Sequence, residues 1–291
     1  MFRGVYTALI TPFQENEEVD EPALRRLVDS QIENGISGLV PVGTTGESPT
    51  VSHEENIRVI EMVVDQAAGR VPVIAGTGSN STREAVEMTR QARAVGADAT
   101  LQVTPYYNKP NQEGLYRHFT TVADEGGLPV LVYNIPGRTG RNVENETMLR
   151  LAEHPAIVGV KEASGSIPQM MDLIATRPDG FCVLSGDDNL AFPLTAIGGE
   201  GVVSVASNAA PRRMVEMIQA ALDGTLEDAR RRHYALLPLF KGVFLDTNPI
   251  PIKYAMSLLG LAAESYRLPL VPLSGEKKKE MRNILETLKL I

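Results

Sequence analysis

The chain has 291 residues, 43% of them hydrophobic, which is enough for one large α/β domain or for two smaller domains. Its formal charge of −8 at pH 7 argues against nucleic acids and anionic membranes as partners, because basic surfaces bind such partners. The single cysteine, Cys182, excludes an internal disulfide and a cysteine-rich metal site. We expect a soluble, cytoplasmic protein, since the sequence shows neither a charged leader nor an apolar run of about 18 residues.

Short apolar runs rich in β-branched residues recur along the chain, most of them bounded by Gly, Pro, Asn or Asp. Such runs are typical of strands. Several are apolar nearly throughout, which is typical of a parallel sheet covered on both faces. In chain order, the predicted strands are GVYTALITPF from residue 4, GLVPVG from 38, VPVIAGTG from 71, ATLQVTPYY from 99, PVLVYNIP from 129, IVGVKEAS from 157, FCVLSGDD from 181 and GVVSVASN from 201.

The segments between these runs show helical periodicity. In residues 21–34, apolar side chains recur at steps of three and four residues. Two pairs, Ser52 with Glu55 and Ser81 with Glu84, have the spacing of a capping box. The pattern therefore alternates predicted strands with predicted helices whose starts are marked by polar caps.

Eight such units in series predict a (β/α)8 TIM barrel, in which closure leaves no strand edge exposed. After the eighth strand the chain has more helix than a barrel needs, over about residues 212–223, 225–240, 249–260 and 276–289. We therefore predict a barrel over residues 1–224 and a C-terminal helical extension over residues 225–291 that packs on it.

An open doubly wound sheet is the alternative architecture, with AGTGSNS (75–81) as its phosphate loop. Its glycines at 76 and 78 lack the third glycine of the dinucleotide fingerprint, because Ser81 occupies that place. A Gly-Lys-Ser/Thr sequence is also missing from the chain. Both observations favour the barrel.

Lys161 lies within the sixth predicted strand. Burial of an ammonium is costly and lowers its pKa. An amine with an ordinary pKa of about 10.4 is under 1% neutral at pH 7–8, and each unit of lowering raises the neutral fraction about tenfold. A neutral amine can attack a carbonyl to form an imine. The alternative is that Lys161 forms an ion pair with a carboxylate. The other lysines, including Lys253, lie in predicted loops or helices, where the ammonium can reach water.

Barrel enzymes build their active sites at the carboxyl ends of the strands. If Lys161 points into the barrel, side-chain alternation places Gly159 and Ile157 on its face, which would leave space beside the amine. Tyr133 could then meet Lys161 above the core and move the protons that imine formation requires, or it is an ordinary buried tyrosine. The polar strand ends are GTTGES (43–48), TPYYNKP (104–110), YNIPGRTG (133–140) and SGDDN (185–189).

The adjacent carboxylates of Asp187 and Asp188 could indicate a metal site. A histidine at ligand spacing is missing nearby, and imine chemistry requires neither a metal nor a cofactor. We instead expect Asp188 or Asn189 to cap the following helix.

Taken in this order, the motifs resemble the dihydrodipicolinate synthase family of pyruvate-dependent Schiff-base barrels. The resemblance extends from GVYTALITPF to TNPIPIK (247–253) and covers essentially the whole chain. It implies a lyase that condenses pyruvate with L-aspartate 4-semialdehyde to give 4-hydroxy-tetrahydrodipicolinate, on the branch toward diaminopimelate and lysine. The alternative is a retro-aldol lyase acting on a 2-keto-3-deoxy sugar acid, similar to N-acetylneuraminate lyase.

The resemblance also implies roles for individual residues. Arg138 would hold the carboxylate of the semialdehyde, and sugar-acid lyases generally lack an arginine at that place. Tyr107 would complete a proton relay across a subunit contact. The implied catalytic residues are Lys161 for the imine, Tyr133 as the central acid and base, Thr44 and Tyr107. The implied substrate-binding residues are Thr45, Arg138, Gly186 and Val203, the last through its main-chain carbonyl.

Many members of this family are inhibited by L-lysine at a contact within a tetramer. Pro49 and Asn56 depart from a common form of the lysine-sensitive pattern. The resemblance therefore implies L-lysine as a feedback inhibitor and a homotetramer built as a dimer of dimers. Five residues agree with the lysine-sensitive pattern, namely Ser48, His53, Asn80, Glu84 and Tyr106.

Overall fold

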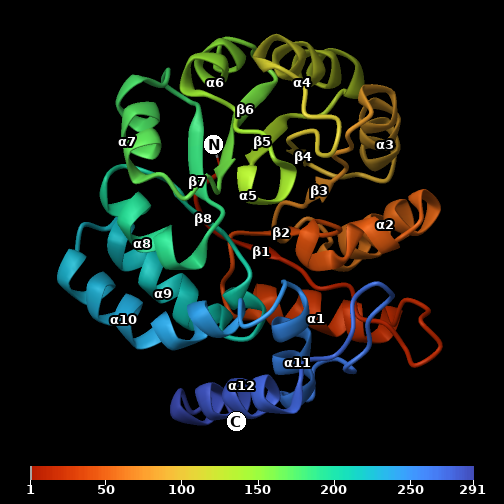
Figure 1. The fold of residues 1–291 in the computed structure, drawn as a ribbon, viewed down its shortest axis with the longest axis vertical. Coiled ribbons are helices and arrows are strands. Elements are labelled where there is room, and N and C mark those ends of the chain that lie inside the picture. The colour runs from red at the N-terminus through yellow and green to blue at the C-terminus, as the bar shows by residue number, and fades with distance from the viewer. Residues whose placement is uncertain (1) are drawn as a thin grey trace.

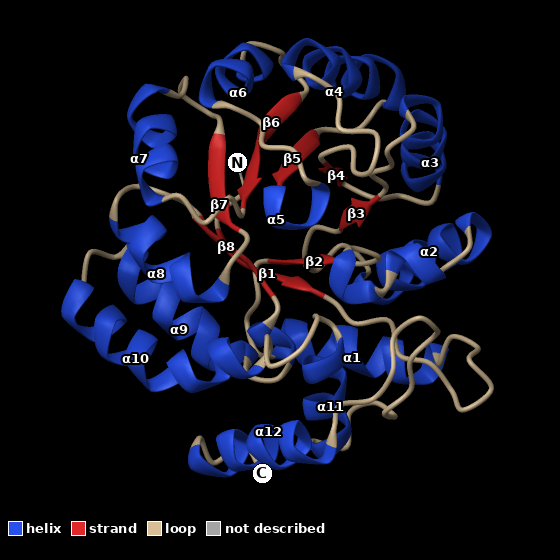
Figure 2. Cartoon of the chain, viewed as in Figure 1, coloured by secondary structure: helices blue, strands red, loops and turns tan. Residues whose placement is uncertain are grey.

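The computed structural model describes residues 2–291, and in this range eight parallel strands form a barrel surrounded by helices (Figures 1 and 2). Neighbouring strands pair in the order β2-β1-β8-β7-β6-β5-β4-β3. A parallel bridge between Leu39 and Val73 joins the two ends of this order, so the barrel is nearly closed and the open-sheet alternative is wrong. The strands are β1 Gly4–Ala8, β2 Gly38–Val40, β3 Ile74–Gly76, β4 Ala99–Val103, β5 Val130–Asn134, β6 Ile157–Glu162, β7 Cys182–Ser185 and β8 Gly201–Ser204.

The helices that follow the strands form the outer layer of the barrel. They are α1 Glu21–Glu33, α2 His53–Ala67, α3 Thr82–Ala94, α4 Gln112–Gly126, α5 Pro136–Thr139, α6 Asn145–Ala152, α7 Ile167–Thr176 and α8 Asp188–Ala196. Ser52 and Glu55 form the predicted capping box at α2. The second predicted box is wrong, because the Glu84 carboxylate accepts a hydrogen bond from the Ser79 hydroxyl (2.8 Å) and Ser81 caps α3 alone.

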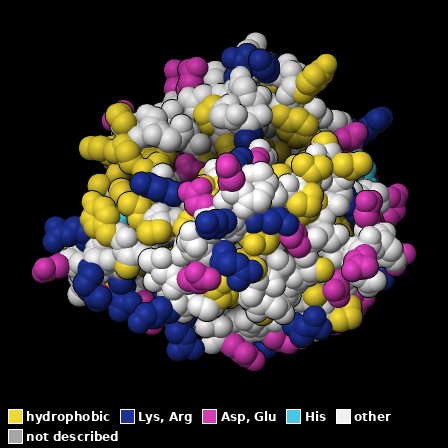
Figure 3. Space-filling view, turned by 60° about the horizontal axis from the view of Figure 1, so that its bottom comes forward, with side chains coloured by type: hydrophobic (Ala, Val, Ile, Leu, Met, Phe, Trp, Pro, Cys, Tyr) yellow, Lys and Arg dark blue, Asp and Glu magenta, His cyan; other side chains and the backbone are white. Residues whose placement is uncertain are grey.

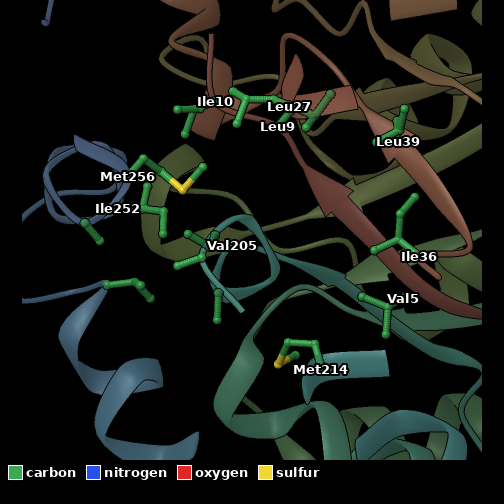
Figure 4. Close-up of a cluster of buried hydrophobic side chains, with 14 of the residues drawn as sticks. Val5, Leu9, Ile10, Leu27, Ile36, Leu39, Val205, Met214, Ile252 and Met256 are labelled. Atoms are coloured by element: carbon green, nitrogen blue, oxygen red, sulfur yellow. The ribbon is translucent and has the colours of Figure 1, made fainter. Parts of the chain in front are cut away.

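Four further helices follow β8, and their bounds agree with the predicted ranges to within two residues. They are α9 Pro211–Leu222, α10 Leu226–Gly242, α11 Ile250–Leu258 and α12 Gly275–Thr287. Figure 4 shows Ile252 and Met256 of α11 beside Ile10 and Val205 of the barrel, all within one cluster of buried side chains. Since this core is shared, the division of the chain at residue 224 stays a prediction.

Two layers of apolar side chains stabilise the sheet. Val132 and Val160 face the helices, whereas Leu131 and Leu184 fill the interior of the barrel. Ile157 also belongs to the helix-facing layer, so its predicted place on the face of Lys161 is wrong. The reason is a bulge, since Val130 pairs with Ile157 while Leu131 pairs with Gly159.

Gly159 does lie on the inner face, but it leaves no space beside the lysine. A Cβ at this position would overlap the sulfur and the carbonyl of Cys182 on the neighbouring strand. The absence of a side chain at Gly159 therefore lets β6 and β7 pack closely, which corrects the predicted reason for this glycine.

The outer surface is mixed in charge. Lys and Arg side chains alternate with Asp and Glu over the face shown in Figure 3, and hydrophobic side chains gather at its left. Exposed hydrophobic residues include Met171 of α7, Ile197 after α8 and Tyr234 of α10. Of the helices within residues 2–291, none combines the length and the apolar character needed to cross a bilayer.

Replacement of Gly159 by alanine should destabilise the barrel by about 1–3 kcal/mol, because the added methyl group overpacks the strand contact with Cys182. Gly275→Ala at the start of α12 is the control, since its Cβ would meet no atom within 4 Å. Urea unfolding should give a lower midpoint for G159A and a nearly unchanged one for G275A. Equal midpoints for the two variants would contradict the packing argument.

Candidate active site

The carboxyl ends of the strands bring most of the predicted site residues together. Tyr133 of β5 and Lys161 of β6 are direct partners across the two strands. Thr44 and Thr45 lie in a short 3₁₀ helix, Thr44–Gly46, that follows β2. Arg138 belongs to α5, which lies over the opening of the barrel in Figure 1. Two further predicted residues, Gly186 after β7 and Val203 in β8, complete this end of the barrel.

Lys161 is 5% exposed, and its Nζ lies 4.0 Å from the centroid of the Tyr133 ring. Within residues 2–291, its ammonium has no carboxylate oxygen at salt-bridge distance. Burial lowers the pKa of Lys161 from its ordinary value of 10.5 to about 8, although the charges of Asp187 and Asp188 oppose this shift. Roughly a tenth of the amine is then neutral at pH 7.

Gly186 provides the space beside this amine. A Cβ at Gly186 would lie 3.2 Å from Lys161 Cε and 2.7 Å from Ala163 Cβ. Any side chain at position 186 would therefore displace the lysine. The space that the sequence analysis assigned to Gly159 and Ile157 belongs to this glycine instead.

Tyr133 is buried, and burial raises the pKa of its phenol well above the ordinary value of 10. The Arg138 guanidinium and the neighbouring Thr44 hydroxyl oppose that shift only in part. The phenol therefore keeps its proton at neutral pH and is able to donate it to a neighbouring group. A neutral amine beside a protonated phenol is suited to attack a carbonyl and to protonate the oxygen that leaves.

Asn248, which lies just before α11, is a site residue to which the sequence analysis assigned no role. Its side-chain amide donates a hydrogen bond to Thr45 Oγ1 (3.0 Å), and its carbonyl accepts one from Arg138 Nη2 (3.2 Å). Asn248 is 4% exposed, and its Oδ1 has no partner within the described chain. The sequence does contain a signal for this residue, because Asn248 is the second residue of the TNPIP motif, which contributes to the family resemblance.

Lys253 is a second buried lysine, contrary to prediction. Lys253 of α11 was expected to reach water, but its side chain is fully buried and forms an ion pair with Glu47. Burial lowers the pKa of Lys253, and the charge of Glu47 opposes that shift. Of these two buried lysines, only Lys161 therefore lacks a carboxylate that would hold its proton.

The two adjacent aspartates have a structural arrangement that differs from the predicted one. Asp188 accepts hydrogen bonds from the Ser204 hydroxyl (2.5 Å) and from the backbone N–H groups of Val205 and Ala206 (3.1 and 2.9 Å). It therefore ties α8 to the loop after β8 instead of capping its own helix. Asp187 is the N-cap residue of α8, without a side-chain cap, and burial raises the pKa of both carboxyl groups.

One cavity of about 300 Å³ is lined both by predicted catalytic and substrate-binding residues and by residues of the predicted L-lysine site. Thr44, Tyr133 and Arg138 line it together with four residues of the predicted lysine site, Ser48, His53, Glu84 and Tyr106. Asn80 does not line the cavity, but its amide donates a hydrogen bond to the carbonyl of Tyr106 (3.1 Å). Asn56 also lines the cavity and is buried, with an unpartnered Oδ1.

Two predicted catalytic residues, Lys161 and Tyr107, do not line this cavity. Lys161 lies directly behind it, against the Tyr133 ring, whereas Tyr107 lies at the surface. The Tyr107 side chain is 91% exposed, and its φ of 70° places the backbone in the left-handed region. Within a single chain, Tyr107 therefore does not contact Tyr133 or Lys161.

Comparison with known proteins gives one consistent result. Residues 1–288 match the family described as the Dihydrodipicolinate synthetase family. A 4-hydroxy-tetrahydrodipicolinate synthase of Pelobacter propionicus is 50% identical over 291 residues, covering 100% of both chains. The corresponding synthase of Methanothrix thermoacetophila is 52% identical over 286 residues, covering 98% of this chain and 96% of its own.

Solved structures agree with the barrel and carry ligands. A chloride-inhibited dihydrodipicolinate synthase of Acinetobacter baumannii, complexed with pyruvate, is 43% identical with a TM-score of 0.98 and covers 100% of both chains. The enzyme of Cyanidioschyzon merolae with lysine bound is 42% identical with a TM-score of 0.97, covering 100% of this chain and 99% of its own.

Borohydride trapping of a 2-oxo acid on Lys161 should become faster as the pH rises to about 8 and should then level off. Only the neutral amine attacks, and burial lowers the pKa of Lys161 to about 8. Peptide mapping by mass spectrometry between about pH 6 and pH 10 measures the rate, with the peptide of Lys253 as the internal control. A rate that keeps rising to pH 10, or label on Lys253, would contradict the assignment.

Proposed function

The chain belongs to the dihydrodipicolinate synthetase family, and we propose that Lys161, Tyr133, Thr44 and Arg138 carry out the reaction of that family in this barrel. The reaction condenses pyruvate with L-aspartate 4-semialdehyde to give 4-hydroxy-tetrahydrodipicolinate, the first committed step toward diaminopimelate and lysine. The enzyme is therefore a lyase that works through a Schiff base. Relatives that are 50–52% identical and bear the synthase name favour this function over a sugar-acid lyase.

The observation that carries the residue assignment is the Lys161 amine, which is buried beside the Tyr133 ring without a carboxylate partner. The nitrogen attacks C2 of pyruvate, and the carbinolamine loses its hydroxyl group as water to give an iminium ion. Loss of a proton from the methyl group gives an enamine, whose carbon attacks the aldehyde carbon of the second substrate. The alkoxide that results takes up a proton. The amino group of the second substrate then attacks the iminium carbon, which closes the ring and expels the Lys161 amine.

Tyr133 supplies and recovers these protons. Its raised pKa keeps the phenol protonated, and the Thr44 hydroxyl, which lines the same cavity, is the proposed next step of the relay. Tyr107 is the third member in this proposal. Its 91% exposure supports a contribution to the site of a second copy, because a tyrosine that cannot reach its own cavity is free to reach a neighbour's.

Three residues form the proposed pocket for the pyruvate carboxylate and methyl group. Thr45 is buried at the start of the loop after β2, with its hydroxyl oriented by Asn248. Gly186 leaves room beside Lys161, and the main-chain carbonyl of Val203 in β8 is the third proposed member. A bound pyruvate in the solved relative from Acinetobacter baumannii supports this class of ligand.

Arg138 is the proposed selector of the second substrate. Its guanidinium lines the cavity mouth and is exposed, while one nitrogen is held by the Asn248 carbonyl. A planar cation in that position can bind a short carboxylate bidentately, which a neutral sugar chain does not require. The charge therefore suits aspartate semialdehyde better than a deoxy sugar acid.

A homotetramer built as a dimer of dimers is the proposed assembly, and the cytoplasm its proposed location. The exposed Tyr106 and Tyr107 support one contact between subunits. A second subunit contact is supported by exposed apolar residues elsewhere on the surface, namely Met171, Ile197 and Tyr234. The mixed surface charge in Figure 3 supports the view that neither nucleic acid nor a membrane is a partner.

L-Lysine is the proposed feedback inhibitor, and it would bind in the part of the cavity lined by Ser48, His53, Glu84 and Tyr106. The Glu84 carboxylate is not used by a capping box and can accept hydrogen bonds from an ammonium. The Asn80 amide helps to position Tyr106, because it donates a hydrogen bond to the main-chain carbonyl of that residue. A solved relative with lysine bound favours this ligand.

Replacement of Arg138 by alanine should lower kcat/KM for L-aspartate 4-semialdehyde by roughly 10²-fold, because charged hydrogen bonds to a carboxylate are lost. Borohydride trapping of pyruvate at Lys161 should remain. Arg230→Ala, an exposed arginine on α10, is the control and should leave both readouts unchanged. A wild-type protein that turns over no semialdehyde would contradict the function, and an unchanged kcat/KM in R138A would contradict the role of Arg138.

Replacement of Glu84 by glutamine should raise the L-lysine concentration for half-inhibition by roughly 10-fold or more, because the ammonium loses its charged acceptor. Glu87→Gln, on the exposed face of the same helix, should leave inhibition unchanged. Initial rates with millimolar L-lysine measure the effect. Absence of inhibition in the wild-type protein would exclude the proposed site.

A further inference from the structure

Glu47 and Lys253 form the most deeply buried ion pair within residues 2–291. Both side chains are completely shielded from solvent, whereas the next most buried pair, Arg177 with Glu200, is 14% and 13% exposed. Lys253 Nζ also lies 4.2 Å from the centroid of the Phe13 ring. The second carboxylate oxygen of Glu47 accepts a hydrogen bond from the backbone N–H of a residue in the C-terminal extension, Arg267 (3.3 Å).

Glu47 stands at the turning point of the loop that carries the proposed catalytic threonine. It separates the 3₁₀ helix Thr44–Gly46 from a second one, Ser48–Thr50, and its φ of 57° is left-handed. Its N–H donates to the carbonyl of Thr44 (3.1 Å), and its carbonyl accepts from the N–H of Thr50 (2.9 Å). A non-glycine residue keeps this sparsely populated conformation only where its surroundings hold it there.

The charged partner of Glu47, Lys253, belongs to α11. On either side of Lys253, the side chains of Ile252 and Met256 pack into the core beside Ile10 and Val205 (Figure 4). The lysine therefore projects from a helix that is itself firmly packed. Asn248, on the segment leading into α11, makes a second attachment to the same loop through Thr45.

A stabilising role alone does not account for such a pair. Removing two charges from water is costly, and a well-packed apolar pair of similar volume often stabilises a protein equally well or better. A fully buried ion pair does, however, select one geometry, since displacement of either group leaves an unpaired charge. In this protein the selected geometry is that of the loop over residues 44–50.

We propose that the Glu47–Lys253 ion pair is a positioning device for the reaction, which holds residues 44–50 against α11 so that the Thr44 hydroxyl stays at the Tyr133 phenol. Neither residue touches the substrate. The inference rests on the proposed function, because it assumes that Thr44 and Tyr133 act together in proton transfer. Its consequence is that the C-terminal extension forms part of the catalytic apparatus.

Glu47→Gln removes one charge with little change in shape and should lower kcat at least 10-fold, together with the melting temperature. KM for L-aspartate 4-semialdehyde should stay within threefold of the wild-type value. Arg138, the proposed binder of its carboxylate, lies on α5 and not on the loop over residues 44–50. The double variant E47Q/K253M removes both buried charges, so it should recover most of the melting temperature without recovering kcat. Glu200→Gln is the matched control, since it breaks the Arg177 pair near the amino ends of the strands and should lower stability without lowering kcat.

Each kcat is calculated per active site, and the number of active sites is the amount of Lys161 that pyruvate and borohydride label. Unfolded protein is thereby left out of the count. Recovery of kcat in parallel with the melting temperature in E47Q/K253M would overturn the proposal, as would a kcat of E47Q within twofold of wild type. Should E47Q yield no folded protein, Glu47→Asp keeps both charges but shortens the reach of the carboxylate, and the same limits on kcat apply. An inactive wild-type protein would instead contradict the proposed function itself.

Discussion

Burial of the Lys161 amine without a carboxylate partner is the constraint on which the rest of the structure depends. Lys161 is buried on the inner face of the barrel, where solvation of the ammonium is lost and nearby carboxylates compensate only in part. Lys253 shows the opposite solution, in which an equally buried ammonium contacts a carboxylate. The two lysines share burial but differ in partner. Lys161, the proposed nucleophile, therefore differs from Lys253 in lacking a carboxylate that would hold its proton.

The barrel keeps this costly arrangement in place. Tyr133 and Lys161 are partners across β5 and β6, and the residues that follow them, Asn134 and Glu162, are linked by a buried hydrogen bond (3.0 Å) on the other face. Slippage of one strand by a residue would turn its member of the proposed catalytic pair toward the helices and bring its member of the polar pair into the barrel. The same register therefore serves the core and the site.

The loop after β2 connects the active site with regions that are remote in the sequence. Thr44 faces Tyr133, Ser48 lines the same cavity, and Glu47 between them is held by α11. Asn248 adds a link from that segment to Thr45 and Arg138. The C-terminal helices thus do more than cover the barrel, because they hold polar groups at the mouth of the site.

The amino-acid sequence by itself determined the succession of strands and helices, the C-terminal helix bounds to within two residues, and the position of Lys161 inside a strand. These features follow from local periodicity and from the neighbours along the chain. Only the tertiary structure decided that Ile157 faces the helices, that Gly186 makes room for the amine, and that Lys253 is buried. The physical reason is distance along the chain, since a bulge depends on the neighbouring strand, and the partners in the Glu47–Lys253 contact are 206 residues apart.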